Sequence, residues 1–355
     1  MRVSVNSMKT NSMYRQSGTV FVWHRLPVTF VALTLLSGLL ISCLDHRDGP
    51  VVPGIATVAT GFLSPIGVDV DVSGRAWVTE AGTGKNDGRV SVVTADGKVT
   101  TAITGFESDI FQGEVDGLSH LLFTDGLLYI LHSNHKLYKA NVASFKPGDA
   151  PLKATDLPFE DIGGFVSAQT LADNPGQESH TYQMAVGPGG DLFFADAAAN
   201  VIVRRAKGTG AFSILANIPG IVNPTPVGPP AIQSVPTGVV YDGQNLLVST
   251  LMGFPFPAGQ AIVYQVTIGG TVTVYQKGFN PLTGIDVNNG PVVLEYGTFG
   301  QQGWVPKSGR LLRVNKPGVT VLADGLNEPT ALKKINASQY YVVSLGDGTL
   351  LKVTF

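Results

Sequence analysis

Short apolar segments occur in pairs along most of the chain, and a tight polar turn joins the two members of each pair. Six such hairpins are present, with turns at Ser73-Gly74, Asp125-Gly126, Gly189-Gly190, Asp242-Gly243, Asn289-Gly290 and Asn336-Ala337-Ser338. Gly, Asn and Asp tolerate the positive φ that a two-residue hairpin requires. Successive hairpins begin 50, 67, 54, 46 and 47 residues apart, counted from Gly67, Gly117, Met184, Gly238, Gly284 and Ala331. Repeats of about 40–50 residues built only from strands are typical of a β-propeller.

Two further strands follow the hairpin in four of the repeats. They cover residues 89–93 and 98–103, 201–205 and 212–216, 261–266 and 272–276, and 310–314 and 319–323. The second strand of each hairpin is an almost continuous apolar run, as in 127–131 and 340–343. A sheet with one face in water would alternate apolar and polar residues, so these runs indicate sheets covered on both faces. A propeller blade between two neighbours is covered in this way.

The last repeat is one strand short, because the chain ends at Phe355 soon after its third strand. Residues 55–60 precede the first repeat and have the pattern of a spare strand. Thr57-Val58-Ala59-Thr60-Gly61-Phe62 is similar to the fourth strand Thr101-Ala102-Ile103-Thr104-Gly105-Phe106. We therefore predict an all-β, six-bladed β-propeller over residues 55–355, closed by an N-terminal strand that completes the last blade. Closure protects the sheet edges; the alternative is an open array of β-sandwiches.

Two insertions lengthen the repeats. Residues 158–180 contain a predicted short helix, 165–172, which Asn174-Pro175-Gly176 would end. Residues 219–236 are rich in proline. Both insertions come just before a first strand, so we expect them at the same end of the ring.

The N-terminal segment has a different composition. Four basic residues, Arg2, Lys9, Arg15 and Arg25, come before an apolar run at 26–41. The run is shorter than the ~20 residues of a membrane-spanning helix and is typical of a secretory signal. It ends at Leu40-Ile41-Ser42-Cys43, which resembles a bacterial lipobox, and Cys43 is the only cysteine. We predict a lipoprotein signal peptide at 1–42, a lipidated Cys43, a tether at 43–54 and a place in the bacterial cell envelope, periplasmic or surface-facing. The alternatives are an ordinary signal peptide and an uncleaved anchor.

The charge of the chain makes nucleic acid an unsuitable partner. The 355 residues carry a formal net charge of −2. Removal of residues 1–42 takes away four positive charges and no negative ones, which changes the net charge to −6. No basic stripe remains to neutralise phosphates. A chain with one cysteine also forms no internal disulfide.

The fold would bring polar residues together at one mouth of the central channel, where first strands begin and second strands end. Second strands end at Glu80, His132, Asp196, Thr250, Glu295 and Asp347; first strands begin near Asp116, His180, Thr237, Thr283 and Thr330, with Glu114 and Glu328 just outside. One interpretation is a site for a small polar ligand or a divalent cation, since carboxylates suit Ca²⁺ and added histidine suits a transition metal. The other is a solvated mouth whose polar groups pair with one another. For a metal we favour the second interpretation, because no short metal motif such as His-Glu-x-x-His occurs.

Two loops at this mouth carry aromatic residues. Residues 251–257 and 296–304 follow the second strands of adjacent blades, so they would place Phe254, Phe256, Phe299 and Trp304 side by side. Prolines stiffen the first loop and lower the entropy lost on binding. The rings would form a wall for a hydrophobic or sugar-like ligand, or for a partner protein. The alternative is that they pack onto the blades and only close the loops.

Several segments resemble the ScyD/ScyE family. They are Ser64-Pro65-Ile66-Gly67 to Glu80-Ala81-Gly82-Thr83-Gly84, residues 180–197, and Val235-Pro236-Thr237-Gly238 together with Gly253-Phe254-Pro255-Phe256-Pro257. The resemblance covers nearly everything from Ile55 to the end, and it implies an exported six-bladed propeller of the NHL and TolB type. The family takes its name from a gene cluster for scytonemin, an indole-phenol sunscreen. The resemblance implies the fold and export, and no particular activity.

Three functions are compatible with the sequence. The leading hypothesis is a lipid-anchored, monomeric propeller, not an enzyme, that binds a small molecule or a protein partner at the mouth. The first alternative is a metal-dependent hydrolase or lyase of the gluconolactonase or streptogramin-lyase type, with Glu80, His132, Asp196 and Glu295 as metal ligands or bases. The second is a structural scaffold of the envelope.

Overall fold

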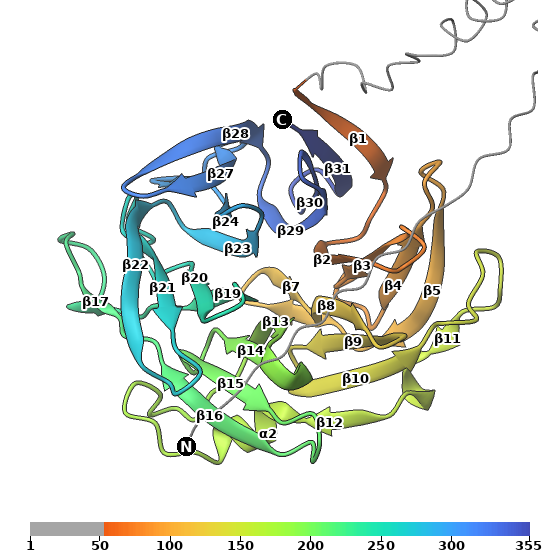
Figure 1. Ribbon diagram of the computed structural model, residues 1–355, viewed down its shortest axis with the longest axis horizontal. Helices are drawn as coiled ribbons and strands as arrows, with labels where there is room; N and C mark the ends of the chain where they lie inside the picture. Colours follow the sequence, from red (N-terminus) through yellow and green to blue (C-terminus); the bar gives the residue numbers. More distant parts are fainter. Residues whose placement is uncertain (1–52) are drawn as a thin grey trace, which may run out of the picture. The chain divides into compact units, whose positions relative to one another are not determined.

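The structure, a computed structural model, describes residues 53–355. These residues form six antiparallel sheets arranged as the blades of a propeller around a central channel (Figure 1). The predictions of an all-β fold and of six blades are therefore confirmed. Among residues 53–355, no helix is long and apolar enough to cross a membrane.

Each blade has four antiparallel strands, which in blades 1–5 follow the chain from the channel outward. In blade 1 a short fifth strand, β11 (Leu152–Lys153), pairs parallel with the outer strand. Blade 1 contains β2 (Pro65–Val70), β3 (Ala76–Glu80), β4 (Gly88–Val93) and β5 (Val99–Phe106), and blade 2 contains β8 (Leu118–Thr124), β9 (Leu127–His132), β10 (Lys136–Asn141) and β12 (Phe159–Asp161). Blade 3 contains β13 (Thr181–Val186), β14 (Leu192–Asp196), β15 (Val201–Arg205) and β16 (Phe212–Asn217), and blade 4 contains β19 (Pro236–Tyr241), β20 (Leu246–Thr250), β21 (Ala261–Val266) and β22 (Val272–Phe279). Blade 5 contains β23 (Leu282–Val287), β24 (Pro291–Glu295), β27 (Gly309–Asn315) and β28 (Gly318–Leu326).

Blade 6 joins the two ends of the described chain. It contains β29 (Pro329–Asn336), β30 (Gln339–Ser344) and β31 (Thr349–Thr354), with β1 (Gly54–Thr60) as its outer strand. Strands β1 and β31 pair antiparallel, with Ile55 opposite Val353 and Thr60 opposite Thr349. The closing strand predicted from the sequence is therefore confirmed.

The remaining elements are short, and apart from β11, which pairs with β5, they lie in the connections. They are β6 (Asp109–Phe111), β7 (Glu114–Asp116), β11 (Leu152–Lys153), η1 (Ala154–Asp156), α2 (Ile162–Ser167), η2 (Pro188–Gly190), β17 (Ile221–Val222), β18 (Ala231–Ile232), β25 (Phe299–Gly300) and β26 (Gly303–Trp304). The helix predicted at 165–172 matches α2 only in part. It begins at Ile162, because the side chain of Asp161 accepts a hydrogen bond from the Gly164 N–H and caps it. It already ends at Ser167, so the prediction that Asn174-Pro175-Gly176 ends it was wrong. The proline-rich insertion contains the hairpin β17–β18, which the sequence did not indicate.

The tight turns have the geometry that their residues predict. Asn289 and Gly290 have φ values of 55° and 115° between β23 and β24. Asp125 and Gly126 have φ values of 52° and 77° between β8 and β9. Two successive positive φ values match the right-handed twist of the strands that the turn connects.

The apolar core is divided into six clusters, and each lies between two neighbouring blades. Between blades 1 and 2, the fully buried Trp77 packs in one cluster with Leu128 and Ile130. Between blades 4 and 5, Val263 and Leu312 share another. Because each buried aliphatic side chain contributes about 1.5–3 kcal/mol, every blade depends on both of its neighbours.

Every inner strand has a register shift near its beginning. In blade 1 the shift lies between Pro65 and Val68, and the other five inner strands have one at the corresponding place. Such a bulge bends the strand and turns its side chains. The inner strands are crowded here, since a Cβ at Gly67 would lie 2.7 Å from the Cα of His120 in the next blade.

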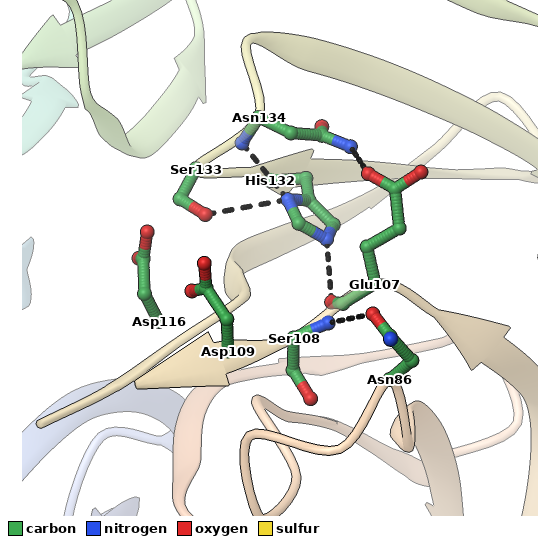
Figure 2. Close-up of a pocket in the computed structure, with 8 residues that line it drawn as sticks. All are labelled: Asn86, Glu107, Ser108, Asp109, Asp116, His132, Ser133 and Asn134. Atoms are coloured by element: carbon green, nitrogen blue, oxygen red, sulfur yellow. Dashed lines mark hydrogen bonds between the residues drawn. The ribbon is translucent and has the colours of Figure 1, made fainter. Parts of the chain in front are cut away.

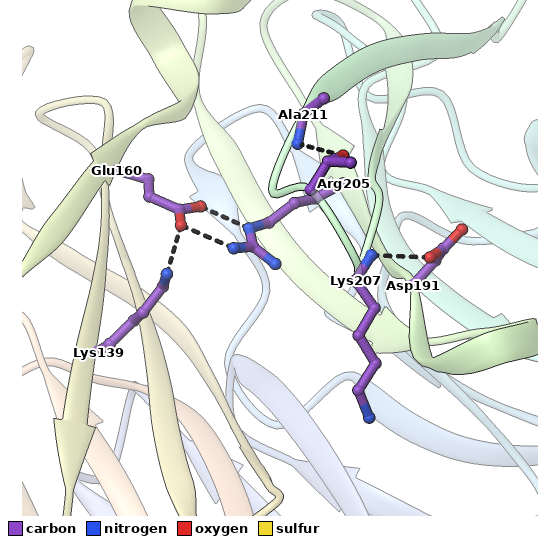
Figure 3. A network of polar contacts seen from close by, with 7 residues as sticks. Lys139, Glu160, Asp191, Arg205, Lys207 and Ala211 are labelled. Atoms are coloured by element: carbon purple, nitrogen blue, oxygen red, sulfur yellow. Dashed lines mark hydrogen bonds and ion pairs between the residues drawn. The ribbon is translucent and has the colours of Figure 1, made fainter.

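The outer strand of blade 2 is only three residues long, and an ionic network holds it in place (Figure 3). Glu160 of this strand accepts hydrogen bonds from the Arg205 guanidinium of blade 3 at 2.5 and 2.7 Å, and it also pairs with Lys139. Burial raises the pKa of Glu160, but the hydrogen bonds from Arg205 and Lys139 outweigh it and lower the pKa below its usual value. The network therefore ties blade 2 to blade 3.

We expect β1 to carry much of the stability of the ring. A chain that starts at Gly61 lacks β1, which leaves the edge of β31 without its partner. Six residue pairs join the two strands, so at about 0.5–1.5 kcal/mol per hydrogen bond the free energy of unfolding should fall by about 3–9 kcal/mol. Urea denaturation against a chain that starts at Pro53 measures the difference. Equal midpoints for the two chains would contradict the closing role of β1.

Candidate functional site

Three carboxylates that the sequence assigned to the channel mouth brace the blades. Glu80, Asp196 and Glu295 end the second strands of blades 1, 3 and 5, and each is at most 1% exposed. Each accepts a hydrogen bond from the backbone N–H of the loop that enters its own blade, from Leu63 at 2.7 Å, His180 at 2.9 Å and Asn280 at 2.9 Å respectively.

The same three carboxylates also bind groups further along the blade. Glu80 accepts from the Arg89 guanidinium at 2.7 Å and from the Ser91 hydroxyl at 2.5 Å. Glu295 accepts a hydrogen bond from the Arg310 guanidinium at 2.7 Å, and Asp196 accepts one from the Ala199 N–H at 3.0 Å. Their oxygens are thus engaged within the protein, and the prediction that they bind a ligand stays a prediction.

His132 occupies the corresponding position in blade 2. Its Nδ1 accepts a hydrogen bond from the Asn134 N–H at 2.9 Å, and its Nε2 lies 2.8 Å from the Glu107 carbonyl oxygen. Since a carbonyl only accepts, Nε2 carries the proton and the ring is neutral. Burial is the main reason that the pKa of His132 is lowered, despite the nearby charges of Glu107 and Asp116. An imidazole with both nitrogens engaged is a poor general base.

Three of the four threonine hydroxyls assigned to the mouth lie instead between blades, and the fourth, that of Thr250, donates to the Ile262 carbonyl within blade 4 at 2.9 Å. Thr237, Thr283 and Thr330 are buried, and they donate hydrogen bonds to the carbonyls of Leu282, Pro329 and Pro65 in the next blade, at 2.7, 2.7 and 3.3 Å. The register shift of the inner strands accounts for the difference, because it turns these side chains toward the neighbouring blade.

Asp347 does not end a second strand. Strand β30 ends at Ser344, and Asp347 lies in the following turn, where it accepts a hydrogen bond from Asn327 at 2.8 Å. Ser344 takes the place of the carboxylates in blade 6, since its hydroxyl donates to the Asn327 carbonyl of the entering loop at 2.6 Å.

The hairpin β6–β7 brings acidic side chains to the mouth. It connects blade 1 to blade 2, with Asp109 opposite Asp116, and Figure 1 shows β7 close to the centre of the ring. The carboxylates of Asp109 and Asp116 lie side by side in a pocket of about 360 Å³, facing Ser133 and His132 (Figure 2). The sequence did not indicate this hairpin, because its strands have only three residues each.

A second pocket, of about 610 Å³, lies on the other side of Asp116. Its wall includes Glu114 and Phe111 of the hairpin and Glu178 and His180 of the insertion before blade 3. The structure thus brings Asp116 and His180 together, as the sequence indicated. Among residues 53–355, none of the carboxylates Asp109, Glu114, Asp116 and Glu178 forms an ion pair.

Five aromatic rings from blades 4 and 5 form a continuous cluster. We call Phe254, Phe256, Tyr296, Phe299 and Trp304 the aromatic cluster. The ring centroid of Phe256 lies 5.0 Å from that of Phe299 and 5.1 Å from that of Trp304. Phe254 is 51% exposed and contacts both phenylalanines. The rings therefore lie together as the sequence indicated, and their role in binding stays a prediction.

Tyr296 connects the aromatic cluster to the acidic hairpin. Its ring centroid lies 4.7 Å from that of Trp304. Burial raises the pKa of Tyr296 most, and the nearby charges of Glu328 and Glu114 raise it further. Glu114 also lines the second pocket, so aromatic rings and carboxylates face one mouth of the channel.

A divalent cation at the mouth would need ligands that are not already engaged. Within the described part of the chain, no group of three or more His, Cys, Asp or Glu side chains is arranged to hold one. The three carboxylates that end second strands, Glu80, Asp196 and Glu295, already accept hydrogen bonds from N–H and O–H groups of the protein. These three carboxylates are therefore not available as Ca²⁺ ligands, and we derive no step through a metal.

Comparison of the sequence with protein-family models and with curated proteins gives no match. The resemblance to the ScyD/ScyE family therefore stays a prediction.

Solved propeller structures do match. A virginiamycin B lyase from Staphylococcus aureus superposes with a TM-score of 0.52 at 16% identity, over 85% of this chain and 99% of that chain. A streptogramin B lyase superposes with a TM-score of 0.54 at 15% identity, over 85% of this chain and 97% of that chain. The aldose sugar dehydrogenase from Streptomyces coelicolor, bound to PQQ, superposes with a TM-score of 0.53 at 16% identity, over 86% of this chain and 99% of that chain. Likeness at this identity shows that the chain has the six-bladed propeller fold.

We expect the substitution Glu80→Gln to lower stability. It leaves the Arg89 guanidinium without its counter-charge, which costs about 3–5 kcal/mol for a fully buried pair. Because the Arg89 side chain is 28% exposed, a smaller loss of about 1–3 kcal/mol is expected in urea denaturation. Asp125→Asn is the control, since its pair with Lys207 is exposed. A Glu80→Gln protein as stable as the control would show that the carboxylate is free for another role.

Proposed function

We propose that this protein is an exported, lipid-anchored propeller that binds a small organic molecule at the mouth formed by the β6–β7 hairpin and the aromatic cluster. One observation carries the proposal: Tyr296 contacts Trp304 on one side and lies near Glu114 and Glu328 on the other. The mouth therefore combines aromatic faces with hydrogen-bond acceptors. Pockets of about 360 and 610 Å³ are in the range that small ligands occupy.

The groups at the mouth suggest the chemistry of the ligand. Aromatic rings stack on flat or apolar surfaces. The carboxylates of Asp109, Glu114 and Asp116 only accept hydrogen bonds when ionised. A suitable ligand therefore has an aromatic or sugar ring that carries hydroxyl or N–H donors. Phe111, 63% exposed at the tip of the hairpin and part of the second pocket, can close over such a ring.

An enzymatic activity is the alternative. Similar structures include lyases and a dehydrogenase. An activity that used Glu80, His132, Asp196 or Glu295 would have to release these side chains from the hydrogen bonds that hold the blades. Binding requires no such change, and the free carboxylates of the hairpin support it.

The lipid anchor rests on the sequence, because Cys43 lies outside the described residues. Strand β1 begins at Gly54, so ten residues, 44–53, separate Cys43 from the propeller. Fully extended, they span at most about 35 Å. We propose that the propeller works within this distance of a membrane surface.

Substitution of Phe256 or Trp304 by alanine should weaken ligand binding at least tenfold. Saturation-transfer NMR with indole, 4-hydroxybenzyl alcohol and methyl glucoside as probes tests this, and we expect at least one probe to bind the unaltered protein. Phe159→Ala is the matched control, because Phe159 is 53% exposed on the outer strand of blade 2. Binding that survives both substitutions, or no binding of any probe, would count against the proposed site.

Substitution Cys43→Ser should release the protein from the membrane. In a bacterial host that processes lipoproteins, we expect the unaltered protein in the membrane fraction with the mass of a lipidated chain that begins at Cys43. The Cys43→Ser protein should lack the lipid mass and appear in the soluble fraction. Equal distribution of the two proteins would show that Cys43 is not the anchor.

A further inference from the structure

The opposite end of the channel holds a separate cavity. It has a volume of about 300 Å³, and residues from all six inner strands line it. The lining residues come from the later parts of these strands, such as Asp69 of β2 and Phe123 of β8. The aromatic cluster and the β6–β7 hairpin lie where the inner strands begin, and none of their residues lines this cavity.

The wall of the cavity carries charges on one side only. Blades 1, 5 and 6 contribute three charged side chains, Asp69, Asp286 and Lys333, beside three aliphatic residues. Blades 2, 3 and 4 contribute no charged side chain; aliphatic residues such as Leu122, Met184 and Val240 lie there beside the polar residues His120, Thr124, Gln183 and Tyr241. A ligand that fits this wall has one charged end and a short apolar body.

The charges in the cavity do not balance. Lys333 donates to Asp69 at 2.6 Å, and Asp69 also accepts from the Val70 and Phe123 N–H groups, each at 2.7 Å. Asp286 accepts only from two backbone groups, Val287 N–H at 2.7 Å and Lys334 N–H at 3.1 Å. Within residues 53–355, no cationic side chain lies within 4.0 Å of Asp286. Two carboxylates therefore share one ammonium group.

His120 is a second unsatisfied group in the wall. It is 2% exposed, and its ring packs at a tilt of 56° against that of Tyr182, with 4.5 Å between the centroids. The backbones of Tyr182 and Thr330 lie near, yet neither ring nitrogen makes a well-formed hydrogen bond with a described residue. Burial is the main cause that lowers the pKa of His120 to about 4, so the ring is neutral near pH 7 and keeps one acceptor nitrogen. A buried polar group without a partner costs about 1–3 kcal/mol.

We call this cavity, at the end of the channel opposite the aromatic cluster, the lower cavity. We propose that the lower cavity binds a small primary ammonium ion with a short apolar body. Its positive charge offsets the carboxylate of Asp286, which has backbone hydrogen bonds but no cationic side chain of residues 53–355 within 4.0 Å, and its N–H groups donate to that carboxylate. Its carbon chain lies against the aliphatic side chains of blades 2–4. The mouth formed by the β6–β7 hairpin and the aromatic cluster is the upper mouth. The inference is independent of the function proposed for the upper mouth, since no residue is shared between the two sites.

Isothermal titration of the purified full chain with n-butylammonium chloride tests the proposal. We expect saturable binding that is at least tenfold tighter than for n-butanol or sodium butyrate, which have the same body without the positive charge. Asp286→Asn should weaken n-butylammonium binding at least tenfold, because it removes the charge and keeps the shape. Asp125→Asn, an exposed carboxylate elsewhere, should leave the affinity unchanged.

A second variant keeps the test decisive if Asp286→Asn fails to fold. Val186 lines the cavity and is 37% exposed, so Val186→Phe should fill the space without repacking a core cluster and should abolish binding. Trp304→Ala should leave n-butylammonium binding unchanged, which separates this site from the upper mouth. Three results would overturn the proposal: n-butanol binding as tightly as the cation, no saturable binding at all, or unchanged affinity in the Val186→Phe protein.

Discussion

The burial of both faces of every blade is the constraint on which this structure depends. A four-stranded sheet of apolar second strands is not stable with either face in water, and the six core clusters show that each face is covered by the next blade. Only a closed ring satisfies this requirement for all six sheets at once. Pairing of β1 with β31 completes the ring with a strand from the other end of the described chain, so the first and last blades have a neighbour on each side.

The ring also determines what its polar residues do. Carboxylates at the ends of second strands hold the entering loop of their own blade, as Glu80 holds Leu63. Threonines at the beginning of inner strands hold the next blade, as Thr283 holds Pro329. These groups repeat around the ring because the joints that they stabilise repeat. Groups that are free for binding come mainly from segments outside the repeat, above all the β6–β7 hairpin and the loops with Phe256 and Trp304.

The two ends of the channel differ in chemistry and meet at one aromatic contact. Tyr182 lies near Tyr296 at the upper mouth and raises its pKa, whereas His120 lines the lower cavity. The contacting rings of His120 and Tyr182 therefore lie between the two proposed sites. The upper mouth combines carboxylates with aromatic rings. The lower cavity combines two carboxylates and one ammonium group with aliphatic and uncharged polar residues, and burial raises the pKa of one of these carboxylates, Asp286.

The sequence by itself determined the paired inner strands of the six blades, their turns, the number of blades and the closing strand, because these follow from local apolar pattern and turn chemistry. It also placed Phe256 beside Trp304, since adjacent repeats put their loops at the same end of the ring. Only the tertiary structure decided which polar residues are free. A one-residue register shift turns Thr237 into the blade interface, and the approach of Arg89 and Leu63 buries Glu80. The pairing of Lys333 with Asp69, which leaves Asp286 alone, joins residues more than 260 positions apart. Such contacts depend on side-chain direction and on distant neighbours, and a local pattern contains no information on either.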